Sequence, residues 1–373
     1  MNVLELCLST GVGGLEHYAI RTAKQLTTHG ISCVAVVANN TMTARAMSEA
    51  GITTISLHRL SKIFPIFAAK QLAQIIDKHA IDVMHLHWSN DFNLAVLAKR
   101  FATRPVKLVY TRQMMITRHK HDIYHRFLYR HVDLLLTITE ELRQLALRYL
   151  PMPANRVQTL YYGVEEPPQL NAAQRTALRE SLGIPQNSFA IGMVGRIEPG
   201  KGQYLLIEAV QALLKANYLV HTTLIGPAMN DAYLQSLKKT VEDIGLQQEI
   251  NFYGSHKNPV EIMSAFDVVV LATKQETFGL VLIEAMRNGV AVIGTNAGGV
   301  PEIIDDGKTG LLFEPEDAEG LERCLIRLMQ DVQLCESLAR AGKQKADVQF
   351  SQELHYDRLV KLVQGLVENA GKK

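Results

Sequence analysis

The sequence contains few cysteines, one tryptophan and no long apolar run. Its 4 cysteines among 373 residues show neither C-x-x-C nor His/Cys spacing, which argues against a disulfide scaffold or a structural zinc site. No apolar run reaches the ~18 residues that a membrane-spanning helix requires. The amino terminus has no basic segment and carries Glu5 in its apolar stretch, so we expect no signal peptide and a cytoplasmic protein.

The chain also lacks a strong overall charge, because 39 Lys+Arg nearly balance 37 Asp+Glu. Residues 1–165 nevertheless carry 19 Lys+Arg and 11 Asp+Glu (+8), whereas the remainder carries 20 and 26 (−6). This asymmetry predicts two domains with different partners, the first of which meets something anionic. An ordinary scatter of surface charge is the alternative interpretation.

Short β-prone runs alternate with helical periodicity along the whole chain, which predicts an α/β fold with parallel sheets covered on both faces. We expect strands at Val3–Leu8, Cys33–Ala38, Thr54–Leu57, Val83–Leu86, Leu108–Tyr110, Leu134–Ile138, Val157–Leu160, Ala190–Val194, His221–Ile225, Ile250–Tyr253, Val268–Leu271, Ala291–Gly294 and Gly310–Phe313.

The strand–helix pattern restarts after Pro167 and Pro168, which can continue neither kind of element. We therefore expect two doubly wound domains, residues 1–165 and 188–348, joined by a linker at 166–187. Residues 349–373 form a C-terminal helix whose apolar stripe needs a surface to cover. In such sheets ligands bind at the carboxyl ends of strands, so the strand-to-helix turns are the candidate sites.

The first turn, Ser9–Glu16, contains Gly13 and Gly14 directly before a helix, where free N–H groups can hold an anion. It does not fit the dinucleotide pattern G-x-G-x-x-G, because Glu16 occupies the third glycine position. No acidic residue ends the second strand, so a nicotinamide oxidoreductase is disfavoured. A tight corner without a ligand is the alternative.

Two turns in the second domain combine charge with glycine. Gly195-Arg196 and Lys201-Gly202 place two cations five residues apart after a strand, and two such cations repel each other unless an anion neutralises both. A further strand leads into Glu276-Thr277-Phe278-Gly279, and Glu284 follows eight residues after Glu276 on a helix. The two glutamates are ~10 Å apart at ~1.5 Å per residue, too far to share a proton.

With these motifs the sequence resembles the retaining GT-B glycosyltransferases of family 4 over nearly its whole length. The resemblance depends on the ordered Arg/Lys loop and the E-x7-E element, and is extended by Gly13–Glu16, Phe252–Gly254, Gly298–Glu302 and Gly307–Gly310. It implies a GT-B fold of two doubly wound Rossmann-like domains with a cleft between them. The last helix then packs back on the N-terminal domain, which binds the acceptor.

The resemblance also implies roles for individual residues. Arg196 and Lys201 hold the donor diphosphate, Glu276 lies beside the donor sugar, and these three form the catalytic set. Glu284 accepts from the ribose, and Tyr253–Lys257 borders the base. The remaining donor-binding positions supply backbone: Gly13, Gly14, Gly195, Phe278, Gly279 and Leu280.

One departure from the family pattern concerns a histidine that many relatives carry near the donor sugar. Gln113 stands at that position, after Thr111 and Arg112. A glutamine can hydrogen-bond but cannot transfer a proton near neutral pH. Gln113, Glu16 and His119 are therefore our expected sugar- or acceptor-positioning residues, and Gln113 supports the alternative of a catalytically inactive scaffold that binds a nucleotide sugar or a partner protein.

The sequence lacks an Asp-x-Asp pair, so we expect no metal and no cofactor. The implied activity is hexosyl transfer from a nucleotide-diphosphate sugar, with a UDP-sugar favoured, to a lipopolysaccharide- or exopolysaccharide-type acceptor. The basic, aromatic stretch 112–131 suits contact with an anionic membrane or glycolipid, or is a solvated helix face. No nucleic-acid motif accompanies the charge. A soluble small glycoside as product remains an open alternative.

Overall fold

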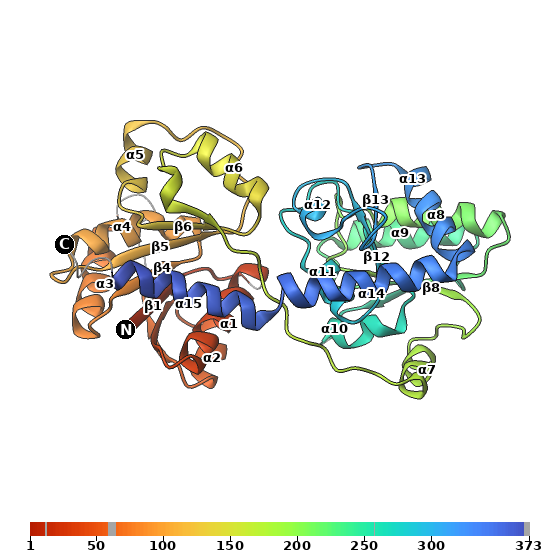
Figure 1. Ribbon diagram of the computed structural model, residues 1–373, viewed down its shortest axis with the longest axis horizontal. Coiled ribbons are helices and arrows are strands. Elements are labelled where there is room, and N and C mark those ends of the chain that lie inside the picture. Colours follow the sequence, from red (N-terminus) through yellow and green to blue (C-terminus); the bar gives the residue numbers. More distant parts are fainter. Residues whose placement is uncertain (12, 59–64, 257, 369–373) are drawn as a thin grey trace. The chain divides into compact units, whose positions relative to one another are not determined.

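A computed structural model describes residues 1–11, 13–58, 65–256 and 258–368 (Figure 1). The described chain divides into two compact units, Met1–Tyr161 together with the chain from Glu353 onward, and Tyr162–Gln352. Each unit is a parallel β-sheet with helices between its strands, which confirms the predicted α/β class.

The first unit contains a seven-stranded sheet in the order β3-β2-β1-β4-β5-β6-β7, with every neighbouring pair parallel. Because β1 neighbours both β2 and β4, the winding direction reverses between β1 and β4. The strands are β1 Asn2–Cys7, β2 Ser32–Val37, β3 Thr53–Ser56, β4 Val83–Leu86, β5 Lys107–Arg112, β6 Leu134–Thr137 and β7 Val157–Thr159.

The helices of this unit begin at recognisable caps. Thr41 and Thr139 accept hydrogen bonds from backbone N–H groups of the first turns of α2 and α6. The helices are α1 Gly14–Thr28, α2 Met42–Glu49, α3 Ile66–Lys78, α4 Phe92–Phe101, α5 Ile123–Tyr129, α6 Glu140–Tyr149 and α15 Gln352–Glu368, with 3-10 turns η1 Ser89–Asp91 and η2 Ala154–Arg156.

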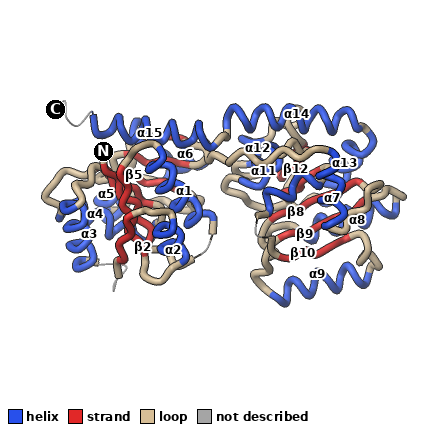
Figure 2. Tube along the Cα trace, turned by 90° about the horizontal axis from the view of Figure 1, so that it is seen from below, coloured by secondary structure: helices blue, strands red, loops and turns tan. Residues whose placement is uncertain are grey.

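Helix α15 covers one face of the first sheet although it is the last element of the chain (Figure 2). Its apolar stripe, Tyr356, Leu359, Val360 and Val363, forms one core cluster with residues of β1, β4, β5 and β6. Leu362, Leu366 and Val367 pack against that cluster and are partly buried. The stripe that the sequence leaves without a partner thus completes the core of the first unit.

The second unit contains a six-stranded parallel sheet in the order β10-β9-β8-β11-β12-β13. Its strands are β8 Phe189–Val194, β9 Val220–Ile225, β10 Ile250–Gly254, β11 Val268–Leu271, β12 Ala291–Thr295 and β13 Leu311–Phe313. Its helices are α7 Ala172–Ser181, α8 Gln203–Lys215, α9 Asp231–Asp243, α10 Pro259–Ile262, α11 Leu280–Arg287, α12 Val300–Ile303, α13 Ala318–Gln330 and α14 Val332–Gln349, with the 3-10 turn η3 Met263–Ala265.

Each predicted strand corresponds to a strand of the structure, with ends that shift by one or two residues. Val83–Leu86 and Val268–Leu271 are unchanged, whereas β5 extends beyond Leu108–Tyr110 at both ends. The segment 166–187, expected to be only a linker, contains α7. Asn171 and Gln174 form a capping box at its start, and Arg175 and Arg179 bind Asp267 of the second unit at 2.7 and 3.2 Å.

A buried hydrogen-bonded histidine joins α15 to the rest of the first unit. The backbone carbonyl of Tyr161 lies 2.6 Å from His355 Nδ1, and the Tyr18 hydroxyl lies 3.1 Å from Nε2. Because a carbonyl only accepts, Nδ1 carries the proton and Nε2 accepts from Tyr18. Burial lowers the pKa of His355 from 6.5 to about 4, so the imidazole is neutral at pH 7.

We predict that the stability of the protein falls between pH 6.5 and pH 4, partly through His355. The unfolded chain takes up a proton on this residue below pH 6.5, whereas the folded chain does so only near pH 4. Stability is therefore present above 6.5 and lost as the pH falls, by about 3 kcal/mol. His355→Gln retains a donor and an acceptor, and should reduce this pH dependence in urea unfolding. The exposed His17→Gln should leave it unchanged; equal slopes for both variants would contradict the prediction.

Candidate functional site

The loops that follow β8 and β11 meet at the carboxyl edge of the second sheet. The chain winds from β8 to β9 on one side, while β11 pairs with β8 on the other. The reversal of winding between β8 and β11 is the place where open parallel sheets bind ligands. Lys201 follows β8 and Glu276 follows β11, so this topology brings together residues 75 positions apart in the sequence.

An ion pair connects these two loops. Lys201 Nζ lies 3.2 Å from Glu276 Oε2, and the two side chains are 25% and 20% exposed. Arg196 is more open, at 56% exposed, and its guanidinium lies 2.9 Å from Glu198 Oε1. Each of the two cations therefore has a carboxylate partner of its own within the second unit.

Glu276 is held by its backbone as well as by Lys201. The backbone N–H of Thr277 donates to Glu276 Oε1 (3.1 Å), and the N–H of Gly299 donates to the Glu276 carbonyl (3.0 Å). Gly298 has a left-handed φ of +60°, and a Cβ at that position would lie 1.8 Å from the same carbonyl oxygen. The glycine turn after β12 therefore fixes the position of Glu276.

The amino terminus of α11 lies next to Glu276 in the chain. Gly279 adopts φ +104° and caps the helix without a side-chain hydrogen bond. The first N–H groups of a helix have no partner within it and attract anions, so those of Leu280 and Val281 can donate to a ligand. Phe278 is buried, with its ring 5.4 Å from that of Tyr162, and anchors this turn. Glu284, on the same helix, is partly buried.

Other predicted positions of the second unit lie in the loops at the same edge. Gly195 directly follows β8, and its N–H donates to the Ile225 carbonyl (2.9 Å). Tyr253 is the penultimate residue of β10 and is 38% exposed, with its ring 6.1 Å from that of His256. The expected base-binding stretch extends to Lys257, which lies outside the described residues.

The remaining predicted residues belong to the first unit. Gly13 caps α1 without a side-chain bond, and Gly14 begins the helix. Glu16 is buried and accepts a hydrogen bond from the Ser9 hydroxyl. Glu16 therefore holds the glycine turn closed, which gives a physical reason for an acidic residue at the position where the dinucleotide pattern requires glycine.

Gln113 and His119 occupy different surroundings. Gln113 follows β5, and its Nε2 is buried without a hydrogen-bond partner among the described residues. This amide can donate to a ligand that reaches it. His119 is exposed, and its ring stacks edge-on against Tyr149 at 4.5 Å. The structure therefore gives His119 a packing partner rather than a place beside Gln113.

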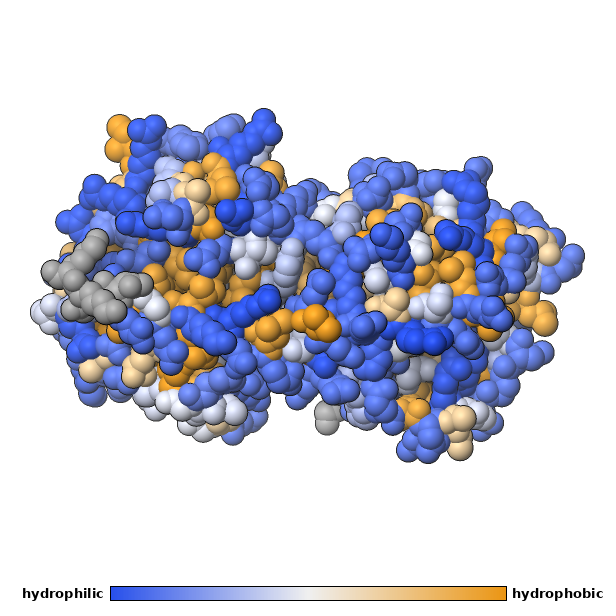
Figure 3. All heavy atoms as spheres, in the orientation of Figure 1, coloured by the Kyte–Doolittle hydropathy of each residue, from blue (hydrophilic) through white to orange (hydrophobic). Residues whose placement is uncertain are grey.

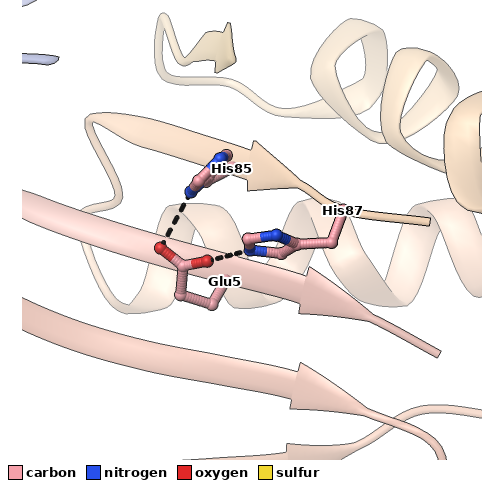
Figure 4. A group of neighbouring side chains, drawn as sticks. All are labelled: Glu5, His85 and His87. Carbon is pink, nitrogen blue, oxygen red and sulfur yellow. Dashed lines mark hydrogen bonds and ion pairs between the residues drawn. The ribbon is translucent and has the colours of Figure 1, made fainter. Parts of the chain in front are cut away.

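Three buried polar residues were missed by the sequence analysis as a group (Figure 4). Glu5 of β1 faces His85 of β4 and also His87, the residue directly after the end of β4. His85 Nδ1 lies 3.1 Å from one carboxylate oxygen of Glu5, and His87 Nε2 bonds the other. All three side chains are almost fully buried. The available signal was His-x-His at the end of one apolar strand and a lone glutamate in another.

This Glu5–His85–His87 cluster has the composition of a metal site, since one ligand atom from each residue lies within 4.8 Å of the others. It is also explained by hydrogen bonds alone, because His85 Nε2 lies 2.7 Å from the Thr111 hydroxyl. Burial alone would raise the pKa of Glu5, but the two histidines outweigh it and lower the pKa to about 2. The carboxylate is therefore ionised at neutral pH.

Comparison with known proteins covers both units. Residues 12–166 match the family model described as Glycosyltransferase Family 4, and residues 174–345 match Glycosyl transferases group 1. N-acetyl-alpha-D-glucosaminyl L-malate synthase from Bacillus anthracis is 26% identical over 76% of this chain and 75% of its own length. The lipopolysaccharide core biosynthesis mannosyltransferase LpsB from Rhizobium meliloti is 26% identical over 67% and 69%.

Among solved structures, Anabaena Alr3699/HepE in complex with UDP aligns with a TM-score of 0.87. The alignment covers 98% of this chain and 100% of that one at 20% identity. At this level of identity the likeness shows a common fold, and it extends over both units.

The contact between Gly298 and Glu276 predicts the effect of one methyl group. Gly298→Ala should destabilise the protein both through its left-handed φ and through a clash with the Glu276 carbonyl. Gly245→Ala is the matched control, because Gly245 has φ +72° and no atom lies within 4 Å of the place that its Cβ would take. The control should cost about 1–2 kcal/mol, and Gly298→Ala clearly more, in urea unfolding. Equal losses would show that the turn does not constrain Glu276.

Proposed function

Because the chain belongs to the GT-B glycosyltransferases of family 4, we propose that it transfers a hexose from a nucleotide-diphosphate donor, preferably a UDP-sugar, to a glycan or glycolipid acceptor of the cell envelope. The acceptor is of the lipopolysaccharide or exopolysaccharide type. The observation that carries the proposal is the meeting of Lys201, Glu276 and the start of α11 at one sheet edge.

The chemistry of sugar transfer fits these groups. When the bond between sugar and phosphate breaks, negative charge develops on the diphosphate. Lys201, Arg196 and the first N–H groups of α11 are donors fixed before the reaction, so they can stabilise that charge with little reorganisation. Glu276, on the loop between β11 and α11, accepts hydrogen bonds from sugar hydroxyls, and Glu284 accepts from the ribose.

The identities of donor and acceptor are supported by relatives. The Anabaena protein with this fold binds UDP, which favours a uridine donor. The Rhizobium relative is named for lipopolysaccharide core synthesis, which favours an envelope acceptor. The Bacillus relative is named for a malate product, so a small soluble acceptor is the second candidate. Retention of the anomeric configuration follows the family and fits front-face displacement.

Gln113 is the main argument for an inactive scaffold, since it replaces a family histidine. Its buried, unpartnered Nε2 among the described residues can still hydrogen-bond a sugar hydroxyl. We therefore propose that Gln113 positions the donor sugar and that proton transfer is left to the departing phosphate.

In this proposal contact with the membrane is peripheral. No helix among the described residues has the length and apolarity needed to span a bilayer. The face drawn in Figure 3 is mostly hydrophilic with scattered apolar areas. The basic stretch 112–131 is the part of the first unit that we propose faces anionic lipid or glycolipid.

Replacing either donor-site cation tests the proposed function. Lys201→Ala or Arg196→Ala should reduce transfer by ~10²–10³-fold, the usual cost of losing one stabilising group, without unfolding the protein. Lys274→Ala is the control, since Lys274 is exposed in the same loop as Glu276 and pairs with Glu316. Proton NMR of the product reports both rate and anomeric configuration. Near-parental turnover in both variants would refute the assignment, and an inverted product would refute retention.

Chelation tests the proposed independence from metal. EDTA should leave transfer unchanged, because the proposed leaving-group stabilisation uses only side chains and backbone N–H groups. Metal analysis of the purified protein reports separately on the Glu5–His85–His87 cluster. Strict dependence of transfer on added divalent metal would contradict the proposal.

A further inference from the structure

A small cavity lies at the carboxyl edge of the first sheet, and its lining does not include the Glu5–His85–His87 cluster. Its volume is about 190 Å³. Residues after β4, at the end of β5, in the loop that follows it and along α4 and α5 line it, among them Tyr110, Arg112, Lys120, Tyr124 and His125. None of the individual residues assigned from the sequence to donor or acceptor lines this cavity.

Arg112 is the central charge of this cavity. The residue is 8% exposed, and its guanidinium donates to the Tyr110 hydroxyl and the Met115 carbonyl, both at 3.0 Å. The Nε group is buried without a partner among the described residues. Neither acceptor carries a formal charge, so the positive charge of Arg112 is buried without a carboxylate, which is costly unless an anion compensates it.

A second cation adds to the positive charge of this cavity. Lys120 lines the same cavity, and its side chain makes no hydrogen bond or ion pair with any described residue. Burial, and then the charges of Arg112 and Arg118, lower its pKa. Because Arg112 and Lys120 line the same small cavity, their like charges repel each other.

The acidic residues near the cavity do not neutralise these cations. No Asp or Glu is among the lining residues. Asp122 is largely exposed and pairs with His125 Nδ1 at 2.5 Å, while Asp91 accepts from the backbone N–H of Leu8 at 2.8 Å. Among the described residues, the cavity therefore has two cations and no anion.

The size and charge of the cavity indicate which group would occupy it. It is smaller than the ~300–1,000 Å³ of sites for complete drug-sized ligands, so it suits one functional group. A phosphate monoester carries close to two negative charges at neutral pH, which matches Arg112 and Lys120. The hydroxyls and amides of the lining can hydrogen-bond the remaining oxygens.

We propose that this cavity binds a phosphate monoester carried by the acceptor, held by Arg112 and Lys120. That the phosphate belongs to the acceptor rests on the proposed function, but the binding site itself can be tested without any transfer reaction. The phosphate belongs either to a sugar or polyol or to a lipid headgroup, and the two sources share this chemistry.

Calorimetric titration with glycerol 3-phosphate tests the site, with glycerol as the uncharged comparison. The protein carries Lys201→Ala, so that phosphate bound in the donor site does not contribute. Lys120→Gln should weaken binding about tenfold, the usual effect of losing one hydrogen bond to a charged group. Lys78→Gln makes the same change at the exposed end of α3, outside the cavity lining and outside the stretch 112–131, and should bind like the parent. Arg112→Lys, checked for folding by its melting temperature, should also weaken binding.

A second arm uses phosphatidylcholine vesicles with and without phosphatidic acid. Weaker binding by Lys120→Gln but not by Lys78→Gln supports the proposal with either probe, and the probe that binds identifies the source of the phosphate. Equal losses in the two variants, or no binding of either probe by the parent, overturn it. A separate UDP titration of the chain with Lys201 intact reports on the donor site, so failure of the proposed function is distinguishable.

Discussion

Parallel pairing of β8 with β11 is the constraint on which the candidate donor site depends. It places the ends of two strands side by side although β9 and β10 lie between them in the sequence. The Lys201–Glu276 ion pair, the cap of α11 and the glycine turn after β12 all follow from this edge. A single catalytic loop is therefore not the functional unit here, because each loop contributes one or two groups that the sheet brings into register.

The sheets could be predicted from the sequence because buried parallel strands read as continuous apolar runs. Val268–Leu271 is such a run and was placed without error. Helix α7 was missed because two prolines precede it and little of its surface is buried, so it has no clear apolar stripe. Its capping box was a stronger signal of a helix than its apolar pattern. The roles of Gly298 and Glu198 could not be predicted. The close approach of Gly298 to the Glu276 carbonyl and the pairing of Glu198 with Arg196 depend on distances in space, which the spacing of residues in the sequence does not give.

In the first unit, too, the partners of buried polar groups could not be predicted from the sequence. Glu5 and His85 are 80 residues apart and become partners only because β1 and β4 are neighbours. In the sequence, Glu5 is a single charge in an apolar strand, and Arg112 is one of many basic residues in 112–131. The structure separates that stretch into an inward guanidinium at a cavity and outward residues such as Arg118. Net charge indicated an anionic partner, but only burial identifies which cation lacks a counterion.

The two cationic sites differ in a way that suits the proposed reaction. Lys201 is already paired with Glu276, and partly exposed pairs of this kind contribute only about 0–1 kcal/mol. In the proposed reaction a diphosphate displaces Glu276 from Lys201 at little cost, and the freed carboxylate accepts a hydrogen bond from a sugar hydroxyl. Arg112 has no such internal counterion among the described residues. In the proposed phosphate site, the buried charge of Arg112 therefore favours an anionic ligand over a neutral one.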